Sequence, residues 1–311
     1  MFKKVRSIVG YIHCIRSILY HLPSSLSDIR ISHIYHILAD KLNRGERFKL
    51  MLNYFSWYLY HKPNNKTYII TLPNGMKSIV YSDSGVSNIF TKNVDFYEIA
   101  FVRKNFKKGD FIIDAGCNVG NRTLALADII GGGLLIDANE KCFERLKNNF
   151  KLNNLNMSNF YTVCKAVGSK KGIIKFTDIG GTCCENKIIK NEAEVKNIPI
   201  KTIEMTTIDY EMKKIGNPTC AFIKTDVEGY DLDVLIGAIE TLKDNNVKLV
   251  MFERWQGISL QTYIDFFNNL NWIVFTLDSN GRPTTSKQVI ESRGNLFAMP
   301  ECIAPFESER F

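Results

Sequence analysis

Hydrophobic positions in the first part of the chain follow helical spacing. Apolar residues between Val5 and Leu22 recur three or four residues apart, which predicts one face of an amphipathic helix that ends before Pro23. A second helical region is expected at about residues 28–60. The segments 68–72 and 78–81 flank Asn74-Gly75, a pair that tolerates the backbone angles of a tight turn, so they predict a β-hairpin.

From Asp110 onward the pattern changes to short apolar runs that alternate with helical stretches. This alternation predicts an α/β fold in which helices cover both faces of a mainly parallel sheet. Residues 172–204 interrupt the alternation with short β-like pieces, which we interpret as an inserted hairpin or a lid over the sheet. Helices are expected at 121–130 and 140–153, and strands at 111–114, 134–137, 160–166, 221–226, 248–253, 272–277 and 295–299.

Charge and histidine content support a division of the chain near residue 62. Residues 1–62 hold ten Lys and Arg against three Asp and Glu, so this segment carries a charge of +7 out of the total of +8. It also holds all five histidines, and the remainder must therefore perform any acid–base chemistry without imidazole. We expect three parts: a basic helical extension (1–62), a hairpin with a lead-in helix (63–108), and an α/β domain (109–311).

The basic amphipathic pattern of residues 1–22 has two interpretations. It is typical of a helix that lies on an anionic membrane surface, but such a stripe more often packs against the protein's own core. Ser7 to Leu22 is interrupted by His13, Arg16 and His21, so no membrane-spanning helix is predicted. The eight cysteines include no CxxC pair, which favours reduced thiols in the cytoplasm, with or without contact to the inner face of the membrane.

The strongest motif is an apolar strand that runs into a glycine-containing turn and then a helix, over residues 111–123. A dinucleotide fingerprint requires glycines two and five residues after Gly116, and the chain has Asn118 and Asn121 there. The order Asp114, Gly116, Asn118, Gly120 instead fits the acidic loop of enzymes that bind S-adenosylmethionine. Asp137 ends the next strand, where a carboxylate can accept hydrogen bonds from ribose hydroxyls.

Several motifs in this order resemble those of FkbM-type methyltransferases: residues 114–120, Ile136 to Asn139, Ile223 to Gly229 and Met251 to Glu253. The resemblance covers about residues 90–300. It implies a Rossmann-like, seven-stranded class I methyltransferase sheet, S-adenosylmethionine as the methyl donor, and a sugar or natural-product hydroxyl as the acceptor. Family members often have Glu-Pro at the positions of Asp137-Ala138, and the first 80 or so residues have no counterpart in the shared core. The residues expected to bind the cofactor are Glu98, Asp114, Gly116, Asn118, Gly120, Thr123, Asp137, Ala138, Asn139, Ala166 and Asp226.

Methyl transfer to a hydroxyl group is assisted by a general base, and three carboxylates are candidates: Asp226, Glu228 and Glu253. Asp226 and Glu228 follow a buried strand at the end where open α/β sheets bind ligands. Asp226 could alternatively cap the following helix, and Glu228 could complement that helix's dipole. Asp226 and Glu253 could also hold Mg²⁺ together, an alternative we do not favour because paired carboxylates at neighbouring strand ends are common without a metal.

The sequence therefore predicts an S-adenosylmethionine-dependent O-methyltransferase that acts on a saccharide or another hydroxyl-bearing small molecule. The acceptor could carry phosphate, since the basic extension would attract it. No nucleic-acid partner is expected: Asn217-Pro218 precedes its strand and no aromatic residue follows it. The alternatives are a methyltransferase for a lipid, peptide or nucleic-acid acceptor, and a non-catalytic module that binds a membrane surface. The sequence gives no basis for predicting the oligomeric state.

Overall fold

The computed structural model describes residues 31–84, 95–179, 186, 188–189, 198–244, 247–255 and 257–304. The amphipathic helix predicted between Val5 and Leu22 lies outside these residues. The chain divides into two compact units, the first made of Met1–Ile70 with Ile79–Val94 and the second of Thr71–Ser78 with Asp95–Phe311. The boundary predicted near residue 62 falls inside the first unit. No helix in the described part of the chain is long and apolar enough to cross a membrane.

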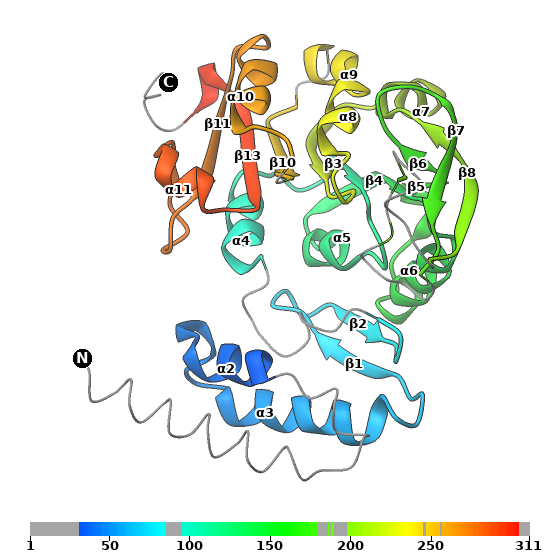
Figure 1. Ribbon diagram of the computed structural model, residues 1–311, viewed down its shortest axis with the longest axis vertical. Helices are drawn as coiled ribbons and strands as arrows, with labels where there is room; N and C mark the ends of the chain where they lie inside the picture. Colours follow the sequence, from blue (N-terminus) through cyan, green and yellow to red (C-terminus); the bar gives the residue numbers. More distant parts are fainter. Residues whose placement is uncertain are drawn as a thin grey trace. The chain divides into compact units, whose positions relative to one another are not determined.

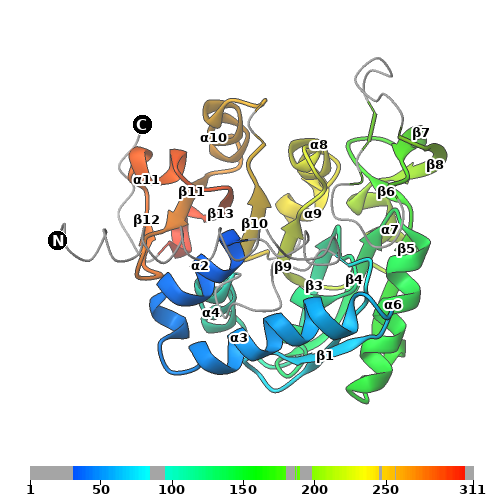
Figure 2. The same ribbon diagram turned by 60° about the horizontal axis from the view of Figure 1, so that its bottom comes forward.

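Helices form the core of the first unit, as the apolar spacing predicted. Its helical elements are α2 (Ile31–Ala39), η2 (Lys41–Asn43), α3 (Arg47–Ser56) and η3 (Trp57–His61). The segment η3 is a π-helical turn that continues α3 without a break (Figure 2). Buried Ile37, Leu50, Tyr54 and Trp57 pack together, so Tyr54 and Trp57 are core residues.

The predicted hairpin is confirmed. Strands β1 (Tyr68–Thr71) and β2 (Lys77–Val80) pair around the turn, and Gly75 adopts a φ of +86°. Asn74 Nδ2 donates to the carbonyl oxygen of Leu124 (2.8 Å), and Lys77 N donates to Asn153 Oδ1 (2.7 Å). These bonds attach the hairpin tip, Thr71–Ser78, to the rest of the second unit.

An eight-stranded sheet runs through the second unit in the order β12-β11-β13-β10-β9-β3-β4-β5 (Figure 1). Neighbours among β10, β9, β3, β4 and β5 pair in parallel, whereas β13 is antiparallel to both β10 and β11. The predicted Rossmann-like α/β class is confirmed, and the eighth strand is the two-residue β12, too short to leave an apolar pattern. The bounds are β3 (Asp110–Ala115), β4 (Ile130–Asp137), β5 (Phe160–Cys164), β9 (Cys220–Thr225), β10 (Leu249–Glu253), β11 (Trp272–Leu277), β12 (Pro283–Thr284) and β13 (Asn295–Pro300).

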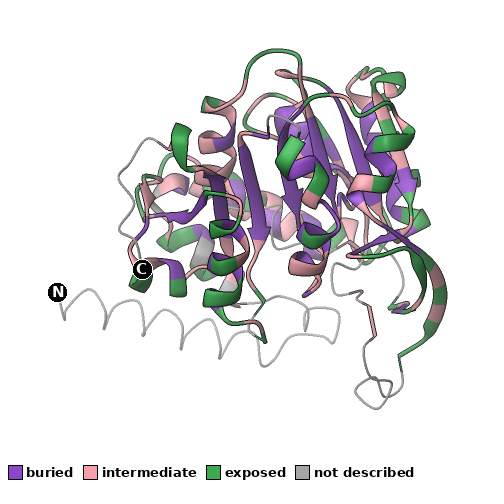
Figure 3. Cartoon of the chain, turned by 90° about the horizontal axis from the view of Figure 1, so that it is seen from above, coloured by how far each residue is buried: buried purple, intermediate pink, exposed green. Residues whose placement is uncertain are grey.

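Helices cover both faces of this sheet because successive strand residues point to opposite sides. Ile113 and Ile223 pack with residues of α7, α8 and α10, whereas Ile112 and Phe222 pack with residues of α4 and α5. The central strands are almost wholly buried (Figure 3). The helices are α4 (Phe96–Lys104), α5 (Asn121–Leu126), α6 (Glu140–Leu152), α7 (Ile208–Lys214), α8 (Asp231–Ile236), α9 (Ile239–Asp244), α10 (Leu260–Asn268) and α11 (Lys287–Glu291), with 3-10 turns η4 (Met157–Asn159) and η6 (Glu301–Ile303).

Two sequence-predicted elements have different bounds in the structure. The helix expected at 121–130 ends at Leu126, and β4 begins at Ile130. Gly131, Gly132 and Gly133 leave no side-chain pattern to mark this strand. Position 131 requires glycine, because a Cβ there would lie only 2.5 Å from the carbonyl oxygen of Gly109. The strand expected at 160–166 divides into β5 and β6 (Ala166–Val167), which belong to different sheets.

The β-like pieces expected within 172–204 form part of a small separate sheet. Strand β7 (Gly172–Thr177) pairs antiparallel with β8 (Ile200–Thr206), and β6 pairs with β8 in parallel. The hairpin interpretation is therefore confirmed for the described residues, while a lid function stays a prediction.

Candidate active site

Four adjacent parallel strands bring acidic side chains to one edge of the large sheet. Asp114 and Asp137 lie near the ends of β3 and β4, Glu253 ends β10, and Asp226 follows the last residue of β9. Strands β4 and β5 follow β3 in the chain and lie on one side of it, whereas β9, which comes later in the chain, lies on the other side. Such a reversal of strand order opens a crevice at the carboxyl ends of the strands, where open α/β sheets bind ligands.

The loop after β3 contains three residues with positive φ: Gly116, Asn118 and Gly120. Gly116 has a φ of +78°, and a Cβ there would overlap the carbonyl oxygen of Asp226, so only glycine fits. Asn118 has a φ of +48°, a conformation that asparagine tolerates better than most residues. Its side chain accepts a hydrogen bond from Val119 N at 2.8 Å. Asparagine is therefore compatible with the backbone conformation at this position of the loop.

The Asp137 carboxylate is fixed by two backbone donors. Asn118 N donates to Oδ2 and Asn139 N donates to Oδ1, each at 2.8 Å. Burial raises the pKa of Asp137 above its ordinary value, although the two N–H donors oppose this effect. The residue is partly exposed, so each oxygen keeps capacity to accept a further hydrogen bond from a ligand.

Lys224 joins the strand β9 to the loop after β3. Its side chain is buried, and Nζ donates to the carbonyl oxygen of Gly116 at 3.1 Å. The same Nζ lies 3.5 Å from Asp114 Oδ1 and 3.3 Å from Asp226 Oδ2. Burial lowers the pKa of Lys224, but the charges of Asp226 and Asp114 raise it above the ordinary value, so the ammonium stays charged.

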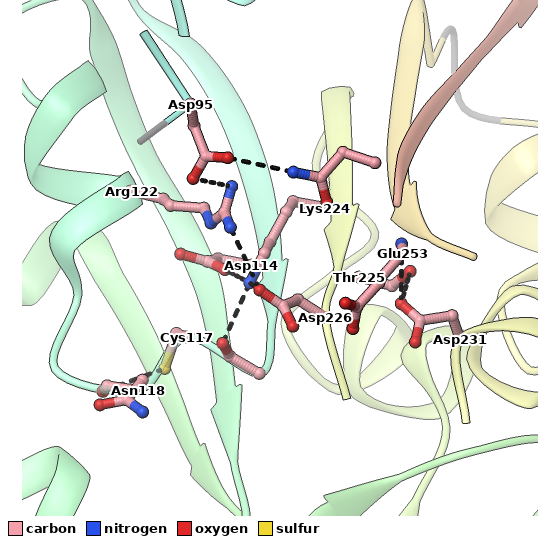
Figure 4. A network of polar contacts seen from close by, with 12 residues as sticks. Asp95, Asp114, Cys117, Asn118, Arg122, Lys224, Thr225, Asp226, Asp231 and Glu253 are labelled. Carbon is pink, nitrogen blue, oxygen red and sulfur yellow. Dashed lines mark hydrogen bonds and ion pairs between the residues drawn. The ribbon is translucent and has the colours of Figure 1, made fainter. Parts of the chain in front are cut away.

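A second cation, Arg122 in α5, reaches Asp226 from the other side. Its Nη2 lies 3.2 Å from Asp226 Oδ2 and its Nη1 lies 2.8 Å from Asp95 Oδ2. Asp95 in turn accepts a hydrogen bond from Asn295 Nδ2 at 3.0 Å. Figure 4 shows Lys224 and Arg122 converging on Asp226. Burial raises the pKa of Asp226, but the two cations outweigh burial and hold it below its ordinary value.

Glu253 is in the opposite electrostatic situation. Burial, together with the negative charges of Asp226 and Asp231, raises its pKa to about 7. Asp231, which is fully buried in α8, accepts hydrogen bonds from Thr225 Oγ1 (2.7 Å) and Glu253 N (3.3 Å). Burial raises the pKa of Asp231 to about 6. One carboxylate at this edge is thus held as an anion, while its neighbour exchanges a proton near neutral pH.

The three predicted catalytic carboxylates lie together. Carboxylate oxygens of Asp226, Glu228 and Glu253 are all within 4.8 Å of one another, close enough to share a divalent cation. Glu228 has a φ of +51° in the turn before α8. The alternative that Asp226 caps this helix has no support, because Tyr230 is the N-cap and Asp226 bonds instead to Lys224 and Arg122.

The other predicted cofactor residues occupy different surroundings. Thr123 is buried in α5, and its hydroxyl donates to Asp114 Oδ2 at 2.7 Å. This hydrogen bond joins β3 to α5, the two elements that flank the loop. Ala138 is partly exposed between Asp137 and Asn139, the N-cap of α6. Glu98, in the first turn of α4, is partly exposed and burial raises its pKa. Ala166 is buried in β6, in the small sheet.

Sequence reasoning assigned no role to Lys224 or Arg122. A signal for Lys224 was present, because it is a charged residue within the apolar run of β9, and buried lysines are almost always paired. Arg122 had no such signal. Its partners Asp95 and Asp226 are remote in sequence, and only the fold brings them together.

The loop after β3 and the Asp137 carboxylate suit a nucleoside-containing cofactor. Gly116 is partly exposed just after β3 and leaves bare backbone that a ligand can approach closely, whereas Gly120 is buried against Leu146 and Phe150. Asp137, at the end of the next strand, offers acceptors in a fixed orientation. The residues present therefore fit the cofactor that the sequence predicted.

Comparison with solved structures gives distant likenesses. An FkbM methyltransferase from Methylobacillus flagellatus is 12% identical with a TM-score of 0.43, over 86% of this chain and 58% of that one. A Streptococcus mutans protein solved with SAH is 9% identical, with a TM-score of 0.41, over 67% of this chain and 98% of that one. An rRNA methylase from Streptococcus thermophilus is 10% identical, with a TM-score of 0.37, over 65% of this chain and 92% of that one. This chain thus spans 58% of the length of the Methylobacillus protein.

No curated protein sequence matches the chain significantly. The profile of the methyltransferase FkbM domain, in contrast, matches residues 114–270, just over half of the chain. The matched segment begins at Asp114, includes the loop after β3, and contains Asp137, Asp226 and Glu253. The chain therefore belongs to the FkbM methyltransferase family.

Proposed function

We propose that the chain transfers a methyl group from S-adenosylmethionine to a hydroxyl group of a saccharide, with Glu253 as the general base. The observation that carries this proposal is the difference between two neighbouring carboxylates, one with a pKa of about 7 and one with a pKa below its ordinary value. Paired groups whose surroundings push their pKa values apart are a common basis for dividing acid–base roles.

The cofactor would be held by the loop after β3 and by Asp137. Asp137 would accept hydrogen bonds from ribose hydroxyls, and Gly116 and Asn118 would line the loop with backbone. When bound, S-adenosylmethionine supplies a methyl group on a positively charged sulfur. Asp226, held in a fixed orientation by Lys224 and Arg122, would lie at the same edge of the sheet.

Glu253 has the properties that a base for a hydroxyl group needs. A base is most effective when its pKa lies near the working pH, and the pKa of Glu253 is about 7. Glu253 would accept the proton that the acceptor hydroxyl group loses during methyl transfer. Asp226 is a weaker base because its two cationic neighbours favour the ionised form. Our assignment thus favours Glu253 among the three predicted candidates.

The position of Trp255 favours an acceptor that contains a ring. It follows Glu253 by two residues, and its side chain is exposed. The indole lies against Gly229, where a Cβ would be 2.9 Å from Trp255 Cδ2, so the glycine allows the ring to rest on the backbone. An aromatic face beside the base provides a flat apolar surface on which the C–H groups of a sugar ring can pack.

A divalent cation held by Asp226, Glu228 and Glu253 is the main alternative for activating the hydroxyl group. We favour direct proton transfer because Lys224 and Arg122 already neutralise Asp226 and would repel a cation placed beside it. Turnover that survives EDTA supports our choice, whereas loss of turnover that added Mg²⁺ restores would contradict it.

The pH dependence of turnover tests the role of Glu253. The ionised base increases with pH, so the rate should rise as pH increases through about 7 and then level off. Glu253→Gln should lower the rate by roughly 10² to 10⁴ and remove this rise. Asp226→Asn is the matched comparison: it removes a negative charge that raises the pKa of Glu253, so the rise should persist but move to lower pH. A folded Glu253→Gln protein with an unchanged rate would contradict the assignment.

Acceptor class requires a separate measurement. Radiolabelled S-adenosylmethionine would be incubated with the protein and panels of sugar nucleotides, glycolipids, peptides and RNA, with Trp255→Ala as a comparison. Label in a saccharide hydroxyl, with a raised KM for Trp255→Ala, supports the proposal. Label only in a lipid, peptide or RNA would replace the acceptor while keeping the chemistry. Calorimetry that detects no binding of S-adenosylhomocysteine would favour the non-catalytic alternative.

A further inference from the structure

The helix made of α3 and η3 has two apolar faces, and only one of them is buried. Leu50, Tyr54, Trp57 and Tyr58 are at most 7% exposed and form the core of the first unit. On the other face, Phe48 is 78% exposed, Leu52 is 55% exposed and Leu59 is 53% exposed.

These exposed residues form a stripe. Phe48, Leu52, half-buried Phe55 and Leu59 follow one another at intervals of four, three and four residues, so they lie along one side of the helix. Single exposed apolar residues are normal on a protein surface, but a continuous row of large ones marks an interaction surface. Tyr60, which is 50% exposed, adds an aromatic ring near the end of this row.

Basic residues lie next to the stripe along the chain. Lys49 follows Phe48 and is exposed, as is Arg44 just before the helix, and Lys62 and Lys66 follow its end. Over residues 31–84 the chain has seven Lys and Arg against three Asp and Glu. Residues 1–30 add five Lys and Arg and one Asp. The apolar row therefore belongs to a strongly cationic segment.

We propose that the stripe Phe48, Leu52, Phe55 and Leu59 binds an anionic lipid surface. A helix with an apolar aromatic and aliphatic face flanked by lysine and arginine suits the boundary between headgroups and acyl chains. Its charge complements anionic headgroups. A second copy of the chain, or the basic residues 1–30, would bring positive charge against positive charge, and so the electrostatics favour a lipid over either of them.

The test is sedimentation of the full chain with vesicles of phosphatidylcholine, with or without phosphatidylglycerol. Wild type should bind the anionic vesicles, bind neutral vesicles at least tenfold more weakly, and dissociate as salt increases. The variant with Phe48→Ser, Leu52→Ser and Leu59→Ser should bind at least tenfold more weakly than wild type. Ile173→Ser, which changes a 74% exposed residue of β7, is the matched control and should bind as wild type does.

Circular dichroism would first show that the triple variant keeps the helical content of wild type, as expected for exposed positions. Equal binding of wild type and the triple variant would overturn the proposal and assign any membrane contact to another segment, such as residues 1–22. Absence of wild-type binding to anionic vesicles would also overturn it. If wild type is a dimer and the triple variant is a monomer, the stripe binds a second copy of the chain instead.

Discussion

Replacing Lys224 with methionine removes a buried positive charge while keeping most of the side-chain volume. Lys224 Nζ lies 3.5 Å from Asp114 Oδ1, 3.3 Å from Asp226 Oδ2 and 3.1 Å from the carbonyl oxygen of Gly116. In the variant, Asp114 keeps its hydrogen bond from Thr123 but has no cation beside it. We therefore expect a large loss in the free energy of unfolding.

The size of this loss follows from the burial of the two carboxylates. Removing one partner of a buried ion pair costs about 3 to 5 kcal/mol, because a buried charge is left uncompensated. The Asp114 side chain is 3% exposed, whereas that of Asp226 is 30% exposed and also contacts Arg122. Only Asp114 is left without compensation, so we expect a loss near the lower end, about 3 kcal/mol.

Urea unfolding followed by tryptophan fluorescence measures this loss. In a Trp57→Phe background, the remaining Trp255 and Trp272 both report on the second unit. A loss of about 3 kcal/mol should lower the urea midpoint by roughly 1 to 2 M. Lys248→Met is the matched control, since Lys248 pairs with Asp110 at 3.6 Å and is 37% exposed, and it should cost about 0 to 1 kcal/mol.

A double variant distinguishes this electrostatic account from a loss of packing. Adding Asp114→Asn to Lys224→Met removes the uncompensated carboxylate, and the amide oxygen can still accept the hydrogen bond from Thr123. Stability should therefore recover in part. The reasoning is refuted if Lys224→Met costs no more than Lys248→Met, or if the double variant is less stable than Lys224→Met alone.

Two further changes test the proposed cofactor site. Asp137→Asn should weaken binding of S-adenosylhomocysteine by about 1 to 3 kcal/mol, through weaker hydrogen bonds to the ribose, and calorimetry that finds wild-type affinity would contradict this. Gly116→Ala should reduce that affinity at least as much, because the added Cβ would overlap the carbonyl oxygen of Asp226 and displace the loop. Gly172→Ala is its control, because nothing lies within 4 Å of an added Cβ there, and equal effects of the two substitutions would show that the loop adapts.

Much of the sheet could be predicted from the sequence because most of its strands are continuous apolar runs. β9 and β11 are buried at every position, and their runs were found with nearly correct bounds. The start of β4 was missed because Ile130 is followed by three glycines, which approach the backbone of Gly109, Asn159 and Ile112 and carry no side-chain pattern.

The sequence predicted which acidic residues form the candidate site, but it did not predict how their pKa values are shifted. Asp114, Asp137 and Asp226 stand at strand ends, and this position together with the motifs around them marked them as candidates. The ranking of Glu253 over Asp226 depends on Lys224 and Arg122, and Arg122 comes from α5, 104 residues from Asp226 in the chain. Spacing along a sequence carries no information about such a pairing.

The β1–β2 hairpin has a consequence for how the protein can be cut or recombined. The chain passes between the two units at residues 70–71, 78–79 and 94–95, since the hairpin tip belongs to the second unit. A fragment that starts at Asp95 would lack Asn74 and Lys77, and with them the hydrogen bonds to Leu124 and Asn153. No single truncation point can therefore deliver either unit whole. A domain exchange between relatives would have to splice the chain at three places, so inheritance of the two units as one piece is the simpler evolutionary route.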